Sequence, residues 1–244
     1  MADERLDKRL AGAGFGSRKD VVRLIRSGKV LVNGSTERDA ARKVGLGAII
    51  DVSGELVELR AAWHLLCHKP QGVVTSTRDP RDPCIIDLIP QEHFRPDFMP
   101  VGRLDKDTTG LLFLTTDGEL AHRLTHPRHK VAKRYVAHLA DPATADDIRA
   151  FAAGEIVLDG DPVLPALLDL GDDPRVVGVT LTEGRYHQVK RMFGARGNAV
   201  VALARVRFGP LALDPSLEVG AYRRLTTGEL RELYTAVGLA DPDG

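Results

Sequence analysis

The residues best suited to chemistry lie in segment 102–118, which has the sequence GRLDKDTTGLLFLTTDG. Within it, Arg103 and Asp105 stand two positions apart in a polar, glycine-bounded loop that leads directly into an apolar strand. A loop held by a rigid strand is a common place for catalytic side chains, and a carboxylate there can take part in nucleophilic catalysis. Asp105 is therefore the first candidate for a catalytic residue. Asp107 is close by in sequence, so a carboxylate pair of the kind that glycoside hydrolases use is an alternative.

The tetrapeptide Arg-Leu-Asp-Lys occurs twice, at residues 5–8 and at residues 103–106. Around the first copy, Leu6 and Leu10 recur four positions apart with charges between them, which predicts an amphipathic helix. We therefore interpret Asp7 as a solvated helix carboxylate. The Thr-Thr-Gly and the apolar strand that follow the second copy distinguish it from the first.

The chain has 244 residues and a formal net charge of zero, but its charge is unevenly distributed. Residues 1–45 carry eleven Lys or Arg against six Asp or Glu, and residues 185–207 carry six against none. In a neutral chain, such asymmetry indicates a local RNA-binding face.

Composition argues against several classes of protein. No apolar run approaches the roughly 18 residues of a membrane span, and the N-terminus lacks the apolar core of a secretory signal. The two cysteines, Cys67 and Cys84, give no disulfide framework, which favours a reducing cytoplasm. The chain has no phosphate-binding glycine loop, and its histidine clusters lack a second ligand pair at metal-site spacing. We expect no cofactor, no metal, no membrane partner and a monomer.

Residues 1–60 are expected to form a small module of helices and short strands. Ser17 with Asp20 makes a capping box for its second helix. The strand at residues 29–32 then runs into the Asn-Gly turn at residues 33–34, a hairpin signal.

Basic residues gather on this second helix and at its exit: Arg18, Lys19, Arg23, Arg26 and Lys29. The order of helix, break, basic helix, strand and Asn-Gly turn resembles the S4 RNA-binding domain. The resemblance implies that these residues contact RNA, whereas a solvated helix face is the alternative interpretation.

A second domain, residues 61–240, is expected after a linker at residues 60–63. Strands and helices alternate there without regular βαβ spacing, which favours an α+β fold with a mixed, mostly antiparallel sheet and peripheral helices. The strands are expected at 65–67, 73–75, 111–115, 131–139, 176–182 and 200–205, and the helices at 117–124, 146–153, 187–196 and 226–237.

Segment 102–118 resembles the signature of the pseudouridine synthases, specifically the branch that acts on bacterial ribosomal RNA (RsuA/RluB type). The resemblance extends over nearly the whole chain, from the S4-like module to residues 205–209. It implies an isomerase that breaks the N-glycosidic bond of uridine, rotates the uracil and rejoins it through C5. That reaction needs neither metal nor cofactor, and the resemblance makes Asp105 its catalytic carboxylate.

Two further catalytic residues follow from the same resemblance. Segment 183–192 resembles the motif whose basic residue pairs with the catalytic Asp, which is Lys190 by position, although Lys190 and a neighbouring arginine would also suit RNA phosphates. Tyr135 is implied to stack on the target uracil, and an ordinary core tyrosine is the alternative. Substrate or RNA contacts are implied for Arg103, Thr108, Lys133, Arg185, His187, Gln188 and Arg191.

The target of the reaction is expected to be a uridine in 16S ribosomal RNA, because Tyr186 and His187 resemble the small-subunit enzyme of this branch. Two alternatives remain open at this point. One is a large-subunit (23S) enzyme of the same family, and the other is a catalytically silent RNA-binding factor of ribosome assembly.

Overall fold

The computed structural model describes residues 3–45, 47–57 and 62–240 and divides into two compact units. The first unit is Met1–Trp63 with Arg95–Asp97 and Ala240–Gly244, and the second is His64–Phe94 with Phe98–Leu239. The predicted boundary between residues 60 and 61, with the start of the predicted linker, lies outside the described residues. None of the helices among the described residues has the length and apolar character needed to cross a membrane.

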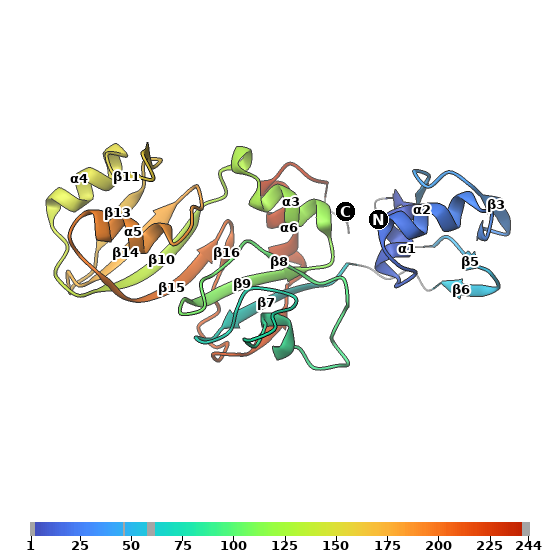
Figure 1. Cartoon of the computed structure of the whole chain (residues 1–244), viewed down its shortest axis with the longest axis horizontal. Helices are drawn as coiled ribbons and strands as arrows, with labels where there is room; N and C mark the ends of the chain where they lie inside the picture. The colour runs from blue at the N-terminus through green and yellow to red at the C-terminus, as the bar shows by residue number, and fades with distance from the viewer. Residues whose placement is uncertain (1–2, 46, 58–61, 241–244) are drawn as a thin grey trace. The chain divides into compact units, whose positions relative to one another are not determined.

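The first unit packs two helices against short antiparallel strands (Figure 1). One sheet has the strand order β3-β2-β5-β6, and a separate pair joins β1 to β4. The elements are β1 (Glu4–Arg5), α1 (Leu6–Gly12), α2 (Arg18–Arg26), β2 (Val30–Val32), β3 (Ser35–Glu37), β4 (Lys43–Val44), β5 (Ile50–Val52) and β6 (Glu55–Val57).

Helix α2 begins at the predicted capping box. The Ser17 hydroxyl accepts a hydrogen bond from the Asp20 backbone N–H, and the Asp20 carboxylate accepts one from the Ser17 N–H. Val21 and Ile25 on this helix are buried with Leu6 of α1, which fixes the opposite face of α2 toward solvent.

The interpretation of Asp7 as a solvated carboxylate is wrong. Its side chain is buried, with 2% exposure, and it pairs with Arg5 at 2.8 Å and with Arg18 at 3.3 Å. The hydrogen bond from Arg5 is the main cause that lowers the pKa of Asp7. A buried carboxylate needs such partners, and Arg18 comes from the neighbouring helix, which the local pattern around Asp7 does not reveal.

The second unit is built on a mixed sheet with the strand order β13-β14-β10-β15-β9-β7-β17, to which β8 and β16 add at β9 and β15. Among the described strands, only β9 and β15 pair in parallel, so the sheet is mostly antiparallel, as predicted. Its strands are β7 (His64–Lys69), β8 (Met99–Val101), β9 (Thr109–Thr115), β10 (Lys133–Leu139), β13 (Leu167–Leu170), β14 (Val176–Leu181), β15 (Val200–Phe208), β16 (Leu211–Ala212) and β17 (Tyr222–Arg224).

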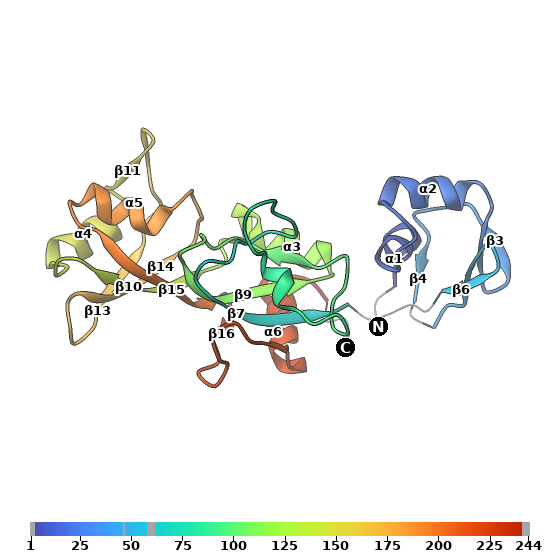
Figure 2. The ribbon, with the colours of Figure 1, turned by 60° about the horizontal axis from the view of Figure 1, so that its bottom comes forward.

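Helices pack on this sheet in two groups, each over its own buried cluster (Figures 1 and 2). Helices α3 (Gly118–Thr125) and α6 (Thr227–Ala236) pack with β7, β8 and β9. Helices α4 (Ala145–Ala153) and α5 (Gln188–Ala195) pack with β10, β13 and β14. The short hairpin of β11 (Val157–Leu158) and β12 (Asp161–Pro162) adjoins α5, and the 3₁₀ turns η1 and η2 are Ile85–Leu88 and Pro127–His129.

The predicted strand at residues 73–75 is not part of the sheet. Only Val74 forms an isolated bridge, with Cys84. The Thr75 hydroxyl instead donates to the Leu104 carbonyl at 2.8 Å and accepts from the Leu104 N–H at 3.1 Å. In the sheet, β7 pairs with β9 on one side and with β17, from the far end of the chain, on the other. Residues 73–75 therefore lie outside the sheet, and Thr75 supports the loop that contains Asp105.

Candidate active site

Asp105 lies in the loop between β8 and β9. The Thr108 N–H donates to the Asp105 carbonyl at 3.0 Å, which closes a turn around the acid. At the end of the loop Gly110 has a φ of +103°, and a Cβ there would lie 2.3 Å from the carbonyl oxygen of Arg205. Only glycine allows so close an approach of two backbones, and this is where β9 and β15 pair in parallel.

Lys69, at the end of β7, supports the same loop through hydrogen bonds to its backbone carbonyls. Its side chain is fully buried, and its ammonium group donates to the carbonyls of Pro70 at 2.9 Å and Thr108 at 2.8 Å. A longer bond of 3.4 Å reaches the Lys106 carbonyl. Burial lowers the pKa of Lys69 to about 8. In the sequence, the only signal for this role is a lysine two positions after the apolar run of residues 65–67.

A cation and an imidazole face the Asp105 carboxylate from the segment that begins α5. The Lys190 ammonium lies 3.3 Å from Asp105 Oδ2 and 2.5 Å from Asp107 Oδ1, and His187 Nε2 lies 3.4 Å from Asp105 Oδ1. The hydrogen bond from Lys190 is the main cause that lowers the pKa of Asp107. The Asp105 side chain is 28% exposed, so its oxygens can be reached by a substrate.

Tyr135 belongs to the same region through the register of three strands. It lies directly opposite Arg205 across β10 and β15, and Arg205 in turn pairs with Gly110 of β9. Neighbouring strands are about 4.8 Å apart, so the Tyr135 backbone lies about 10 Å from the end of the Asp105 loop. Residues opposite each other on paired strands share a face of the sheet, and Tyr135 is close enough to the Arg205 guanidinium to act against the lowering of its pKa by burial.

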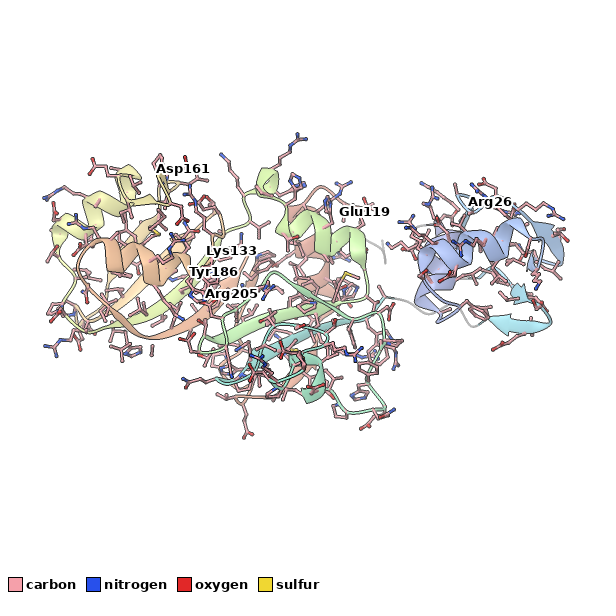
Figure 3. The ribbon with its side chains drawn as sticks, viewed as in Figure 1. Arg26, Glu119, Lys133, Asp161, Tyr186 and Arg205 are labelled. Carbon is pink, nitrogen blue, oxygen red and sulfur yellow. The ribbon has the colours of Figure 1, made fainter. Side chains whose placement is uncertain are left out.

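Arg205 is a functional candidate that the sequence analysis did not single out. Its guanidinium is 2% exposed and donates through Nε to the Leu111 carbonyl at 2.9 Å, whereas Nη2 is buried with no partner in the described part of the protein. Burial lowers the pKa of Arg205 and that of Lys133, which has Arg205 as a neighbouring charge. Figure 3 labels both side chains. The only sequence signal was a cation inside the apolar strand at residues 200–208.

The other residues with implied substrate contacts fall into two groups. Arg103 is exposed and forms no ion pair within the part of the chain that the structure describes, so it does not pair with Asp107. Thr108 is buried, with its hydroxyl unpartnered in the same part of the protein. The remaining three are bonded inside the protein: Arg185 to the Asp161 carbonyl at 3.1 Å, Gln188 to Glu183 at 2.6 Å and Arg191 to Asp159 at 2.5 Å.

The basic residues of the first unit lie on the outer side of α2 and at its exit, and all five are exposed. Arg18 is held by Asp7 and Arg23 by Asp20. Arg26, labelled in Figure 3, has its side chain in solvent. Among the described residues, no group of three or more His, Cys, Asp or Glu side chains is arranged to hold a metal ion.

Comparisons with known proteins identify the family of the chain. Residues 64–195 match the family model described as RNA pseudouridylate synthase, and residues 4–50 match the S4 domain. The chain therefore belongs to the RNA pseudouridylate synthase family, and it is an isomerase that acts on RNA.

Particular relatives and a solved structure extend over nearly the whole chain. An uncharacterised RNA pseudouridine synthase of Bacillus subtilis is 42% identical, covering 94% of this chain and 98% of the relative. A protein of Vibrio cholerae named ribosomal small subunit pseudouridine synthase A is 39% identical, covering 94% and 99%. A crystal structure of a pseudouridylate synthase superposes with a TM-score of 0.68 at 39% identity, covering 94% and 99%.

Proposed function

We propose that this protein converts a uridine of 16S ribosomal RNA to pseudouridine, with Asp105 as the catalytic carboxylate. The observation that carries the proposal is the Lys190 ammonium 3.3 Å from Asp105 Oδ2, on a loop held by buried groups. The choice of the small-subunit RNA is supported by the names of similar proteins from Vibrio cholerae and Pseudomonas aeruginosa, both called ribosomal small subunit pseudouridine synthase A.

The reaction requires the N1–C1′ bond of the target nucleotide to break and a C5–C1′ bond to form; C5 loses its proton and N1 gains one, so the product is an isomer of uridine. Asp105 is the carboxylate that acts at the ribose or the uracil, a form of nucleophilic or general-base catalysis. Lys190 compensates the charge of Asp105 when RNA covers the site and excludes water, because ionic interactions strengthen as the local dielectric falls. The isomerisation oxidises nothing and takes up no group from a donor, so the proposed reaction requires neither a metal nor a cofactor.

Tyr135 holds the uracil while it turns, because an aromatic ring with a polar tip can stack on a base that has left its helix. The buried guanidinium of Arg205, opposite Tyr135 in the register of β10 and β15, helps to position the tyrosine side chain. Arg103, with its side chain free in solvent, contacts the RNA backbone near the target, and Lys133 lines the same region.

The predicted domains, residues 1–60 and 61–240, divide this work. The exposed side chains of Lys19, Arg26 and Lys29 on and beside α2 bind RNA phosphates, and the second domain performs the isomerisation. We further propose that the enzyme works as a monomer in the cytoplasm, where its ribosomal RNA substrate is assembled into subunits.

Tritium release tests the proposal. The protein is incubated with 16S or 23S ribosomal RNA, or with precursor subunits, that carry tritium at uracil C5. The wild type should release tritium from 16S RNA or from the small-subunit precursor. Asp105→Asn should release none, whereas Asp107→Asn, which alters the other carboxylate on Lys190, should stay within about tenfold of the wild type because its interaction is more exposed.

Each other result points to a different conclusion. Release from 23S RNA alone would identify a large-subunit enzyme, and release that survives Asp105→Asn would remove Asp105 from the catalytic role. An absence of release from every RNA and precursor would favour the catalytically silent binder.

A further inference from the structure

Tyr186 is an aromatic side chain in a place where hydrophobic burial does not explain it. It is 75% exposed, immediately before α5, and Figure 3 labels it. One face of its ring is stacked on His187, with ring centroids 3.8 Å apart and planes inclined by 18°. The other face of the ring is left toward solvent.

The segment that carries Tyr186 is held in place by hydrogen bonds on both sides. Gln188 is buried, accepts from the Arg185 N–H at 2.8 Å and donates to Glu183 at 2.6 Å. Arg191 donates to the Tyr186 carbonyl at 3.3 Å and pairs with Asp159 at 2.5 Å. The exposed ring is therefore presented from a fixed backbone, which lowers the entropy that a ligand must overcome on binding.

The stacked pair leads to the proposed catalytic acid. His187 has a left-handed backbone with a φ of +48°, a conformation that side chains other than glycine adopt at a cost and that gathers at functional sites. In that conformation its Nε2 lies 3.4 Å from Asp105 Oδ1. The three groups thus form a continuous row, from the carboxylate through the imidazole to the outer face of the tyrosine ring.

We propose that the Tyr186–His187 pair is a stacking platform for the base of a nucleotide next to the target uridine. The inference rests on the proposed function, because it takes the nucleotide at Asp105 as the target. Every base has a flat π-face, so aromatic rings bind single-stranded RNA by stacking. When the target base turns into the site, its neighbour loses a stacking partner, and the free face of Tyr186 replaces it.

A fluorescent probe tests stacking without requiring catalysis. The probe is a single-stranded decamer of uridines with one 2-aminopurine at its centre, titrated with full-length protein. The wild type and Tyr186→Phe should quench the probe, because both rings stack. Tyr186→Leu keeps apolar bulk without a π-face, and it should bind the probe about tenfold more weakly and lose most of the quenching, as the stacking contribution per base implies. Val219→Ala, which truncates an exposed apolar side chain elsewhere in this unit, should match the wild type.

The tritium-release assay on ribosomal RNA completes the test. Tyr186→Leu should raise KM about tenfold while Tyr186→Phe restores it. Equal quenching by the Leu and Phe variants, or no quenching by the wild type, would overturn the platform. A wild type that quenches the probe but releases no tritium would overturn the proposed function and leave the stacking intact. A different result would assign the ring to a protein partner instead. In that case the Leu variant would still quench the probe, and a ribosomal protein would be pulled down by the wild type but not by Tyr186→Leu.

Discussion

Replacing Lys69 with methionine should change the protein's stability in a way that depends on pH. Lys69 is 0% exposed and donates to the Pro70 and Thr108 carbonyls at 2.9 and 2.8 Å. Burial lowers the pKa of its ammonium group to about 8, from 10.5. Methionine has a similar length and no charge, so Lys69→Met removes the hydrogen bonds and the buried charge together.

At pH 7 these two effects oppose each other. Each buried carbonyl that loses its donor costs about 1–3 kcal/mol. The lowering of the pKa from 10.5 to about 8 means that burying the ammonium group lowers the unfolding free energy of the wild type by about 3 kcal/mol at pH 7. The methionine variant does not have this cost. We therefore expect Lys69→Met to be only about 1 kcal/mol less stable than the wild type at pH 7.

Above pH 8 the balance changes in a known direction. The folded protein releases the Lys69 proton near pH 8, whereas the unfolded chain keeps it until about pH 10.5. The unfolded state then binds more protons, so the contribution of Lys69 to stability rises with pH. The variant lacks this rise, and the difference in unfolding free energy between the two proteins should widen by about 2.5 kcal/mol between pH 7 and pH 10.

Urea unfolding followed by circular dichroism at pH 7, 8, 9 and 10 measures this difference. Lys106→Met is the matched control, because Lys106 lies in the same loop but is half exposed and pairs with Asp82 at 2.6 Å. Its difference from the wild type should stay nearly constant with pH. If the gap between wild type and Lys69→Met fails to widen, burial does not lower the pKa of Lys69 in the folded protein.

Two other substitutions test the surroundings of the site. Gly110→Ala places a Cβ 2.3 Å from the Arg205 carbonyl oxygen and should lower the unfolding free energy by more than about 3 kcal/mol, measured by urea unfolding. The control Gly160→Ala is also at positive φ but has nothing within 4 Å, so it should cost only about 1 kcal/mol. Equal costs would contradict a backbone clash. Glu229, which caps α6, has a pKa lowered to about 2, mainly by the hydrogen bond from Arg223. The folded state binds fewer protons at this carboxylate, so Glu229 stabilises the protein above about pH 4.5. Glu229→Gln should therefore lower the unfolding free energy by about 2 kcal/mol at pH 7, and this difference should fade as the pH falls toward 2. Melting temperatures of the two proteins that differ equally at every pH would contradict this.

The sequence was informative where short segments determine structure. The capping box at Ser17, the helix that begins after Thr226 and most strands of the sheet follow from local patterns. The positions of Asp105 and Lys190 in their motifs came from resemblance to a family, and the structure places these two side chains 3.3 Å apart. Their roles in catalysis stay predictions.

What the sequence did not reveal depends on strand order. Lys69 supports the Asp105 loop only because β7 pairs with β9, and Arg205 reaches Tyr135 only because β15 lies between β9 and β10. Asp7 was misinterpreted because its partner Arg18 is eleven positions away on another helix. Local periodicity carries no information on such contacts.

Asp105 and Asp107 place two carboxylates around the one ammonium group of Lys190. Lys190 lies closer to Asp107, at 2.5 Å, than to Asp105, at 3.3 Å, and Asp107 is the more exposed of the two, with 60% against 28%. A long lysine side chain loses rotamer freedom when it is fixed, and an exposed ion pair adds little stability of its own. We infer that Asp107 acts as an anchor that holds Lys190 beside Asp105 before RNA arrives. The proposed catalytic carboxylate, Asp105, then keeps its cation without a short hydrogen bond that would occupy the oxygen needed by the substrate.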